Sequence, residues 1–78
     1  MKQFPRITLD PAMMGGCACI RGMRMTTAMV VGLLAAGQSR EKILDADPEL
    51  EPGDITQALA YAAWRLQGFE SDLDAACV

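Results

Sequence analysis

Apolar and polar positions alternate in two short stretches near the start of the chain. Residues 7–9 form a strand-like run that ends before Pro11, because proline lacks a backbone donor and favours a turn. Residues 18–25 alternate around a central glycine, which predicts a tight β-hairpin with Arg21 and Gly22 at its tip. Arginine fits the first position of a primed turn poorly, so we expect a type II turn or a small bulge there.

Two helices with clear end signals follow the hairpin. The first is predicted over residues 27–36, because Thr26 can cap its first turn and Gly37 supplies the left-handed residue that commonly ends a helix. The second begins after Ser39, another good capping residue. It ends by Asp47, because the proline that follows disfavours helical backbone in the residue before it.

A third, longer helix is predicted from Pro52, a residue suited to the first helical position, to Gly68. In the first helix Gly32 costs up to about 1 kcal/mol relative to alanine, which predicts that another backbone packs close to it. Residues 69–78 form a short helix or an acidic tail. The positions expected to face the core are Met29, Val30, Leu33 and Leu34 in the first helix, Ile43, Leu44 and Ala46 in the second, and Ile55, Leu59, Ala62 and Leu66 in the third.

The chain is short and apolar for its length. Its 78 residues make one domain, which we place at residues 1–68, with residues 69–78 as a C-terminal segment. A domain of this size buries only about 60 % of its unfolded surface. Because 51 % of the residues are hydrophobic, the excess apolar surface predicts a homodimer. No apolar run approaches the ~20 residues that span a bilayer, so we expect a soluble, cytoplasmic protein without membrane contact.

Charge is divided unevenly along the chain, although the net charge is only −3. Residues 1–43 hold six basic and two acidic side chains, a balance of +4. Residues 44–78 hold eight acidic side chains and one arginine, a balance of −7. This asymmetry favours a basic face and an acidic face, each offered to a different partner. A solvated surface with an accidental asymmetry is the alternative interpretation.

Residues that could carry catalysis are scarce in this sequence. The chain has no histidine and no phosphate-binding glycine loop, which predicts a protein that is not an enzyme. Cys17, Cys19 and Cys77 lack the spacing of a closed four-ligand zinc site, so we interpret them as small apolar residues. We therefore expect no metal and no cofactor.

The helix, short turn, short helix, proline turn and helix follow the order of a trihelical helix-turn-helix domain. An ordered set of residues over about positions 7–63 also matches a known pattern. Its members are Asp10-Pro11, Gly16, Ile20-Arg21-Gly22, Arg24, Leu34-Ala35-Ala36-Gly37, Ser39, Ile43-Leu44, Pro48-Glu49-Leu50, Asp54-Ile55 and Ala58-Leu59-Ala60-Tyr61-Ala62. On these residues the chain resembles the uncharacterised domain family 433 (DUF433), small prokaryotic proteins of antitoxin-like type.

This resemblance implies a mainly α fold, a homeodomain-like trihelical helix-turn-helix bundle preceded by a short N-terminal β-strand or β-hairpin. It also implies the DNA-binding antitoxin of a toxin–antitoxin pair, with a PIN-like ribonuclease as the toxin. The chain departs from the family pattern at Cys17-Ala18, where Lys-Pro is common, and at Met23 and Glu51, where threonine is common. The first departure removes one positive charge from the basic segment.

Operator DNA is the first partner to weigh. The third helix carries Glu51 and Asp54 at the end that would approach phosphate, so it is poorly suited to reading base edges. We therefore expect the hairpins of a dimer to contribute most to DNA contacts. The candidate DNA-binding residues are Arg21, Arg24, Arg6, Arg40, Lys42 and Gln57. The open alternative is that Arg21 and Arg24 pair with acidic residues of a second copy.

A protein is the second candidate partner. Leu66, Phe69 and Leu73 lie among acidic residues near the C-terminal end, a pattern that can dock as an amphipathic segment on a basic protein. An ordinary solvated terminus is the alternative. Two function classes therefore remain: a regulatory antitoxin that binds DNA, and a dimeric protein–protein interaction module that does not bind nucleic acid.

Overall fold

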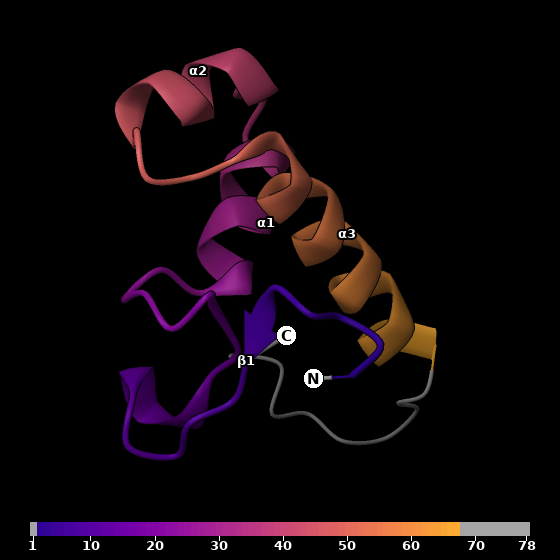
Figure 1. Cartoon of the computed structure of the whole chain (residues 1–78). Helices are drawn as coiled ribbons and strands as arrows, with labels where there is room; N and C mark the ends of the chain where they lie inside the picture. The colour runs from indigo at the N-terminus through magenta and orange to yellow at the C-terminus, as the bar shows by residue number, and fades with distance from the viewer. Residues whose placement is uncertain (1, 68–78) are drawn as a thin grey trace.

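The computed structural model describes residues 2–67, and this part of the chain is mainly helical. Three α-helices follow a short two-stranded antiparallel sheet, which confirms the predicted fold class (Figure 1). The elements are β1 (Ile7–Thr8), the 3-10 turn η1 (Met14–Gly16), β2 (Cys19–Ile20), α1 (Thr27–Ala35), α2 (Arg40–Ala46) and α3 (Pro52–Gln67). The predicted boundary between residues 68 and 69 lies outside the described residues.

The helix ends follow the capping residues that the sequence contains. The side-chain oxygen of Thr26 accepts a hydrogen bond of 3.1 Å from the backbone N–H of Met29, and that of Ser39 accepts one of 3.1 Å from Lys42. At the other end of α1, Gly37 has a φ of +95°, a left-handed conformation that glycine adopts without steric cost. Helix α1 ends one residue earlier than predicted, within the usual fraying of a last turn.

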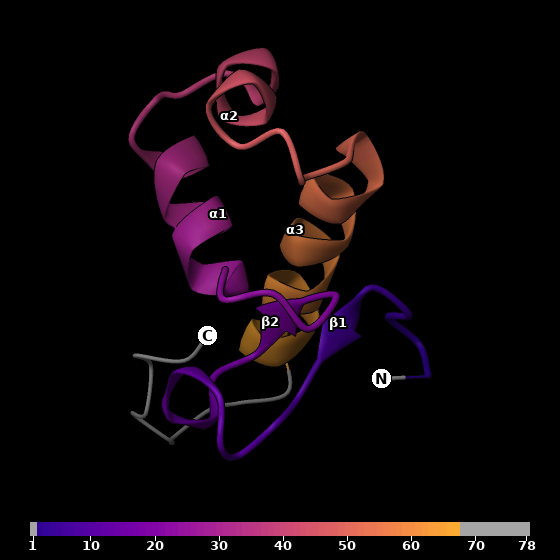
Figure 2. The same ribbon diagram turned by 60° about the vertical axis from the view of Figure 1, so that its left-hand side comes forward.

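The sheet pairs β1 with β2, so the main partner of the predicted hairpin strand is the N-terminal strand. Ile7 lies opposite Ile20 and Thr8 lies opposite Cys19. The returning arm of the hairpin contributes a single bridge, between Cys19 and Thr26. Residues 18–25 therefore form a loop with a turn at the predicted position, but β2 pairs mainly with β1 and not with the second arm of the hairpin (Figure 2).

The turn at the tip of this loop differs from the one we expected. Arg21 has a φ of +46° and Gly22 a φ of +73°, and positive φ at both central residues is the signature of a primed turn. The Met23 N–H donates to the Ile20 carbonyl at 2.8 Å and closes the turn. The prediction of a type II turn or bulge is therefore wrong. The Arg21 side chain forms contacts elsewhere, described below, that offset the strain of its backbone.

The core lies between the sheet and the inner faces of α1 and α3, which pack side by side, while α2 crosses one end of this pair (Figures 1 and 2). Val30 of α1 and three residues of α3, Ile55, Ala58 and Tyr61, are almost completely buried. Small Ala58 allows the two helices to approach closely. The other members of the core are Ile7, Ala18, Ile20, Ile43 and Leu50.

Five residues that we expected in the core are exposed instead: Met29, Leu33, Ala46, Leu59 and Leu66. Helix α1 is apolar on every side, so its sequence does not define which face packs inward. In α3 the buried face follows Ala58 and Tyr61 and not the leucines at 59 and 66. Both helices consequently present apolar side chains to solvent.

Candidate functional site

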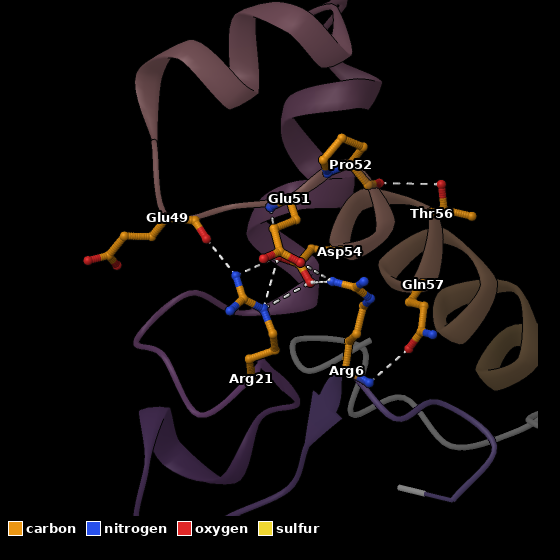
Figure 3. A network of polar contacts seen from close by, with 8 residues as sticks. All are labelled: Arg6, Arg21, Glu49, Glu51, Pro52, Asp54, Thr56 and Gln57. Atoms are coloured by element: carbon orange, nitrogen blue, oxygen red, sulfur yellow. Dashed lines mark hydrogen bonds and ion pairs between the residues drawn. The ribbon is translucent and has the colours of Figure 1, made fainter.

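A buried carboxylate lies at the start of α3 and is surrounded by donors. The side chain of Asp54 is completely inaccessible to solvent, and its two oxygens accept hydrogen bonds from four N–H groups (Figure 3). Arg6 Nη1 lies 2.9 Å from Oδ1, and Arg21 Nη2 lies 2.9 Å from Oδ2. Arg21 Nε is shared between the two oxygens, at 3.1 and 3.2 Å. We call Asp54, Arg6, Arg21 and Glu51 the Asp54 network.

The fourth donor comes from the local helix start. The backbone N–H of Glu51, three residues before Asp54, donates to Oδ2 at 2.8 Å. A side chain at the third helical position that reaches back to the residue before the helix forms one half of a capping box. The negative charge also complements the positive end of the helix dipole. The start of α3 therefore stabilises the Asp54 carboxylate by itself, independently of the two arginines.

Arg6 reaches this carboxylate from just before β1. Its Nη1 also donates to Glu51 Oε1 at 2.7 Å, and its backbone N–H donates to Gln57 Oε1 at 2.9 Å. Its guanidinium lies over Gly53: a Cβ at that position would be 2.9 Å from Arg6 Cζ. The glycine before Asp54 thus leaves the space that the Arg6 side chain occupies.

Arg21 reaches the same carboxylate from the turn after β2. Its Nη2 donates to the Glu49 carbonyl as well as to Asp54, so one guanidinium joins the hairpin to both the α2–α3 connection and α3. The parallel pair of contacts to the carboxylate is the bidentate geometry that arginine makes well and lysine does not. The positive φ of Arg21 therefore accompanies a side chain that is fixed at its far end.

The charges of this network stabilise one another. Burial alone would raise the pKa of Asp54, but hydrogen bonds from Arg21, from the Glu51 backbone and from Arg6 outweigh it, and the pKa is lowered from its ordinary value. Hydrogen bonds to Glu51 and then to Asp54 raise the pKa of Arg6, and the hydrogen bond to Asp54 raises that of Arg21. Asp54, Arg6 and Arg21 therefore all remain ionised around neutral pH.

The six residues that we predicted to contact DNA fall into two groups. Four of them are engaged by other residues of the chain, and two form no ion pair within residues 2–67. Arg6 and Arg21 belong to the Asp54 network, with side chains that are one-third exposed, and the Gln57 side chain is engaged by the Arg6 backbone. The acid that pairs with Arg21 in this single chain is Asp54 of the same chain. Arg40 donates from α2 to Thr56 Oγ1 on α3 at 3.1 Å.

The remaining two cations of this set are Arg24, in the turn before α1, and Lys42, on α2. Both residues are exposed, and neither side chain forms an ion pair with any of residues 2–67. Arg24 precedes α1 in the chain and Lys42 follows it. Two basic side chains of the predicted set are therefore exposed and form no ion pair within residues 2–67.

Of the three predicted partner-binding residues, Leu66 lies within the described part of the chain, and Phe69 and Leu73 lie outside it. Leu66 is 65 % exposed at the end of α3. From the sequence we predicted Leu66 both in the core and in a docking segment. Its exposure contradicts the first prediction and is compatible with the second. Trp64 and Leu59 are also exposed on α3, at 43 % and 36 %.

Side chains that commonly bind metals do not cluster in the described part of the chain. Among residues 2–67, no three His, Cys, Asp or Glu side chains come together in a way that could hold a metal ion. Cys19 is a buried free thiol, and burial raises its pKa. None of the helices described for this chain is both long and apolar enough to cross a membrane.

The central role of Asp54 was not apparent from the sequence. We treated it as a surface acid that complements the helix dipole and repels phosphate. One available signal was its position three residues after Glu51. An acidic side chain at the third position of a helix can accept a hydrogen bond from the backbone N–H of the residue before the helix. Its partners are 33 and 48 residues away in the chain, and no local pattern links them.

The fold and the Asp54 network define a small trihelical domain in which an N-terminal β element is tied to the third helix. The chain belongs to the family described as a protein of unknown function, DUF433, whose model matches residues 7–62. It is 38 % identical over 56 residues to the uncharacterized protein y4eO of Sinorhizobium fredii, a match that covers 72 % of this chain and 25 % of that protein.

A solved structure has the same fold. The crystal structure of a DUF433 member protein from Anabaena variabilis matches 80 % of this chain and 61 % of that one, with a TM-score of 0.76 and 26 % identity. The chain thus spans about a quarter of the length of the curated relative and less than two thirds of the solved one. These relatives define the family and the fold.

Proposed function

We propose that this protein is a small non-enzymatic regulatory protein, the antitoxin of a toxin–antitoxin pair, which acts by binding a partner protein through the outward face of α3. The family resemblance supplies the antitoxin hypothesis and a PIN-like ribonuclease as the toxin. The observation that carries the binding surface is the apolar character of the solvent-exposed side of α3.

That face is continuous and uncharged. Successive residues of a helix are rotated by about 100°, which places Leu59, Ala63 and Leu66 beside one another, with Ala60 and Trp64 on the adjoining side. All five are exposed. An exposed stripe of this kind, with a large aromatic and two leucines, is the usual anchor set of a helix that docks into a groove.

The acidic balance of the C-terminal half of the chain favours a basic partner. Asp45 and Glu49 are exposed acids in α2 and in the connection before α3, and neither forms an ion pair within residues 2–67. Residues 44–78 carry a balance of −7. Exposed acidic groups on a protein steer an oppositely charged partner toward it and increase its association rate.

The test is co-purification after co-expression of this gene with the neighbouring gene of its operon. The neighbouring protein is expected to be retained by the tagged wild-type chain. Leu59→Glu and Leu66→Glu place a charge in the apolar stripe and are expected to abolish retention. Leu9→Glu is the matched control, because Leu9 is 52 % exposed but lies after β1 and outside α3. Truncation after residue 68 separately tests the contribution of Phe69 and Leu73.

Two results would contradict the proposal. One is the absence of any stable complex between the wild-type chain and the neighbouring protein. The other is retention by Leu59→Glu and Leu66→Glu that equals retention by Leu9→Glu, with all three variants folded by circular dichroism. A complex that survives these changes would place the binding surface elsewhere.

DNA binding is the second candidate, favoured by Arg24 and Lys42, which are exposed and form no ion pair within residues 2–67. Each phosphate contact steepens the dependence of log affinity on log salt concentration by about one unit. If the protein retains its own promoter fragment, Arg24→Glu with Lys42→Glu is expected to weaken retention and flatten that dependence. Retention unchanged by this pair would exclude the two cations from the contact.

A further inference from the structure

We infer that the outward face of α1 is a contact surface for a second copy of this chain, centred on Gly32. This inference does not depend on the proposed function, because the antitoxin hypothesis uses α3 and this surface lies on α1. We call Met29, Gly32, Leu33 and Ala36 the α1 seam.

The α1 seam is an apolar surface without a partner in the chain. The residues at positions 29, 32, 33 and 36 follow the i, i+3, i+4, i+7 spacing of one helix face, and all four are exposed. Met29 is 47 % exposed and Leu33 39 %. A helix that is apolar on every side is normally buried on every side, whereas α1 buries only Thr27 and Val30.

Gly32 gives an independent reason to expect a close neighbour. Its φ is not positive, so the helix does not require glycine for its backbone. A Cβ added there would meet nothing within 4 Å, so the packing of residues 2–67 does not require glycine either. The residue nevertheless weakens α1 by up to about 1 kcal/mol relative to alanine. A second backbone that crosses α1 at this point accounts for the missing side chain.

Charge identifies the second backbone as that of another copy. The sequence from residue 25 to residue 38 contains no charged side chain. In a two-fold symmetric contact the same patch lies on both sides of the interface, so a patch with one sign of charge would face itself and be repelled, whereas an uncharged patch is not.

The size of the seam predicts a weak dimer. Helix α1 has nine residues and is about 13 Å long, so a crossing at Gly32 buries a few hundred Å² on each copy. Stable specific interfaces bury about 800 Å² on each partner. The dimer is therefore expected to form at micromolar or higher concentration and to dissociate on dilution.

The test is sedimentation velocity of the full chain from about 1 to about 300 μM, a range that brackets micromolar affinities. The wild type is expected to shift from monomer to dimer. Gly32→Gln, which fits the open space of the monomer but blocks a close crossing, and Leu33→Glu are expected to stay monomeric throughout. Leu9→Glu is the control and is expected to dimerise like the wild type.

Thermal unfolding separates loss of contact from loss of fold. At the lowest concentration Gly32→Gln is expected to melt at or above the wild-type temperature, because it replaces a helical glycine in open space. A wild type that stays monomeric over the whole range would overturn the inference. Dimerisation of Gly32→Gln and Leu33→Glu at wild-type concentrations would also overturn it, since the contact would then lie elsewhere.

Discussion

The two helical glycines Gly53 and Gly32 have opposite surroundings, and the difference separates internal from external constraints. Gly53 lies beneath the guanidinium of Arg6, where a Cβ would be 2.9 Å from Cζ. Gly32 faces open space, with nothing within 4 Å of the same virtual atom. A side chain at position 53 would therefore displace the Arg6 guanidinium, whereas one at position 32 would displace nothing in residues 2–67.

The regions around these glycines differ in the same way. The Asp54 network is polar, buried at its centre and assembled from residues far apart in the chain. The α1 seam is apolar, exposed and formed by one helical segment. A polar cluster whose buried carboxylate is fully hydrogen-bonded acts inside the molecule, whereas an apolar face without a partner indicates contact with another molecule. Substitutions in the two regions should consequently have opposite effects on stability.

The largest effect is expected for Asp54→Ala. This substitution leaves two arginines without their shared buried carboxylate and removes the acceptor of the Glu51 N–H. Breaking a buried ion pair from one side costs about 3 kcal/mol or more, so the free energy of unfolding measured in urea should fall by that amount. Asp45→Ala is the control, since Asp45 is exposed and should change stability little. Equal losses for the two variants would contradict the central role of Asp54.

Acid should weaken the same network in a predictable direction. The pKa of Asp54 is lower in the folded protein than in the unfolded chain, so its stabilising contribution is complete above the unfolded value of about 4. The contribution is lost as the pH falls through the folded value, which lies below the unfolded one. Wild-type stability should therefore decrease below about pH 4 more steeply than that of Asp54→Asn. Parallel pH profiles would show that another carboxylate is responsible.

The local structure in this comparison could be predicted from the sequence. Thr26 and Ser39 cap their helices, Gly37 ends α1, and Pro52 begins α3, because each signal acts within a few residues. The existence of three helices after a β element follows from the same signals.

Long-range structure could not be predicted in this way. The pairing of Arg6 and Arg21 with Asp54 depends on the fold, so the primed turn at Arg21 was also missed. The inward face of α1 was missed because a uniformly apolar helix has no pattern to define it. Of the candidate site, Leu66 was predicted both as a core residue, which its exposure contradicts, and as a docking residue, which stays a prediction, whereas the buried carboxylate was not predicted.

Gly53→Ala tests whether Arg6 is held firmly in place. Alanine has a higher helix propensity than glycine, so this substitution would stabilise the protein if nothing occupied the space beside position 53. Here the new methyl group displaces a guanidinium that is ion-paired with Glu51 and Asp54. We expect the melting temperature to fall by a few degrees, as overpacking of a tight site does. A rise would indicate that the Arg6 side chain moves aside without cost.

Thr27→Val should raise stability by about 1 kcal/mol. The Oγ1 atom of Thr27 is buried on the packed side of α1 and has no hydrogen-bond partner within residues 2–67. Valine has almost the same shape and removes a polar atom that burial leaves unsatisfied. The change is measured by urea denaturation, with Thr27→Ser as the control that keeps the hydroxyl. A loss of stability for Thr27→Val would reveal a partner for that hydroxyl.

The smallest effect is expected for Gly32→Ala, the counterpart of Gly53→Ala. In dilute solution, where the chain is monomeric, this substitution should raise the free energy of unfolding by up to about 1 kcal/mol. The measurement is thermal unfolding at low protein concentration. A decrease would mean that a neighbour within the chain already occupies the space beside Gly32, and the contrast between the two glycines would then disappear.

The Asp54 network has a further consequence for the order of folding events. Its ion pairs close loops of 33 and 48 residues, whereas the helix caps close within three. Contacts between distant residues carry the larger loop-closure entropy, so they are expected to form after the rate-limiting step. Asp54→Ala should then accelerate unfolding and leave the folding rate nearly unchanged. The network would in this way determine how long the native state persists, and the helices how quickly it is reached.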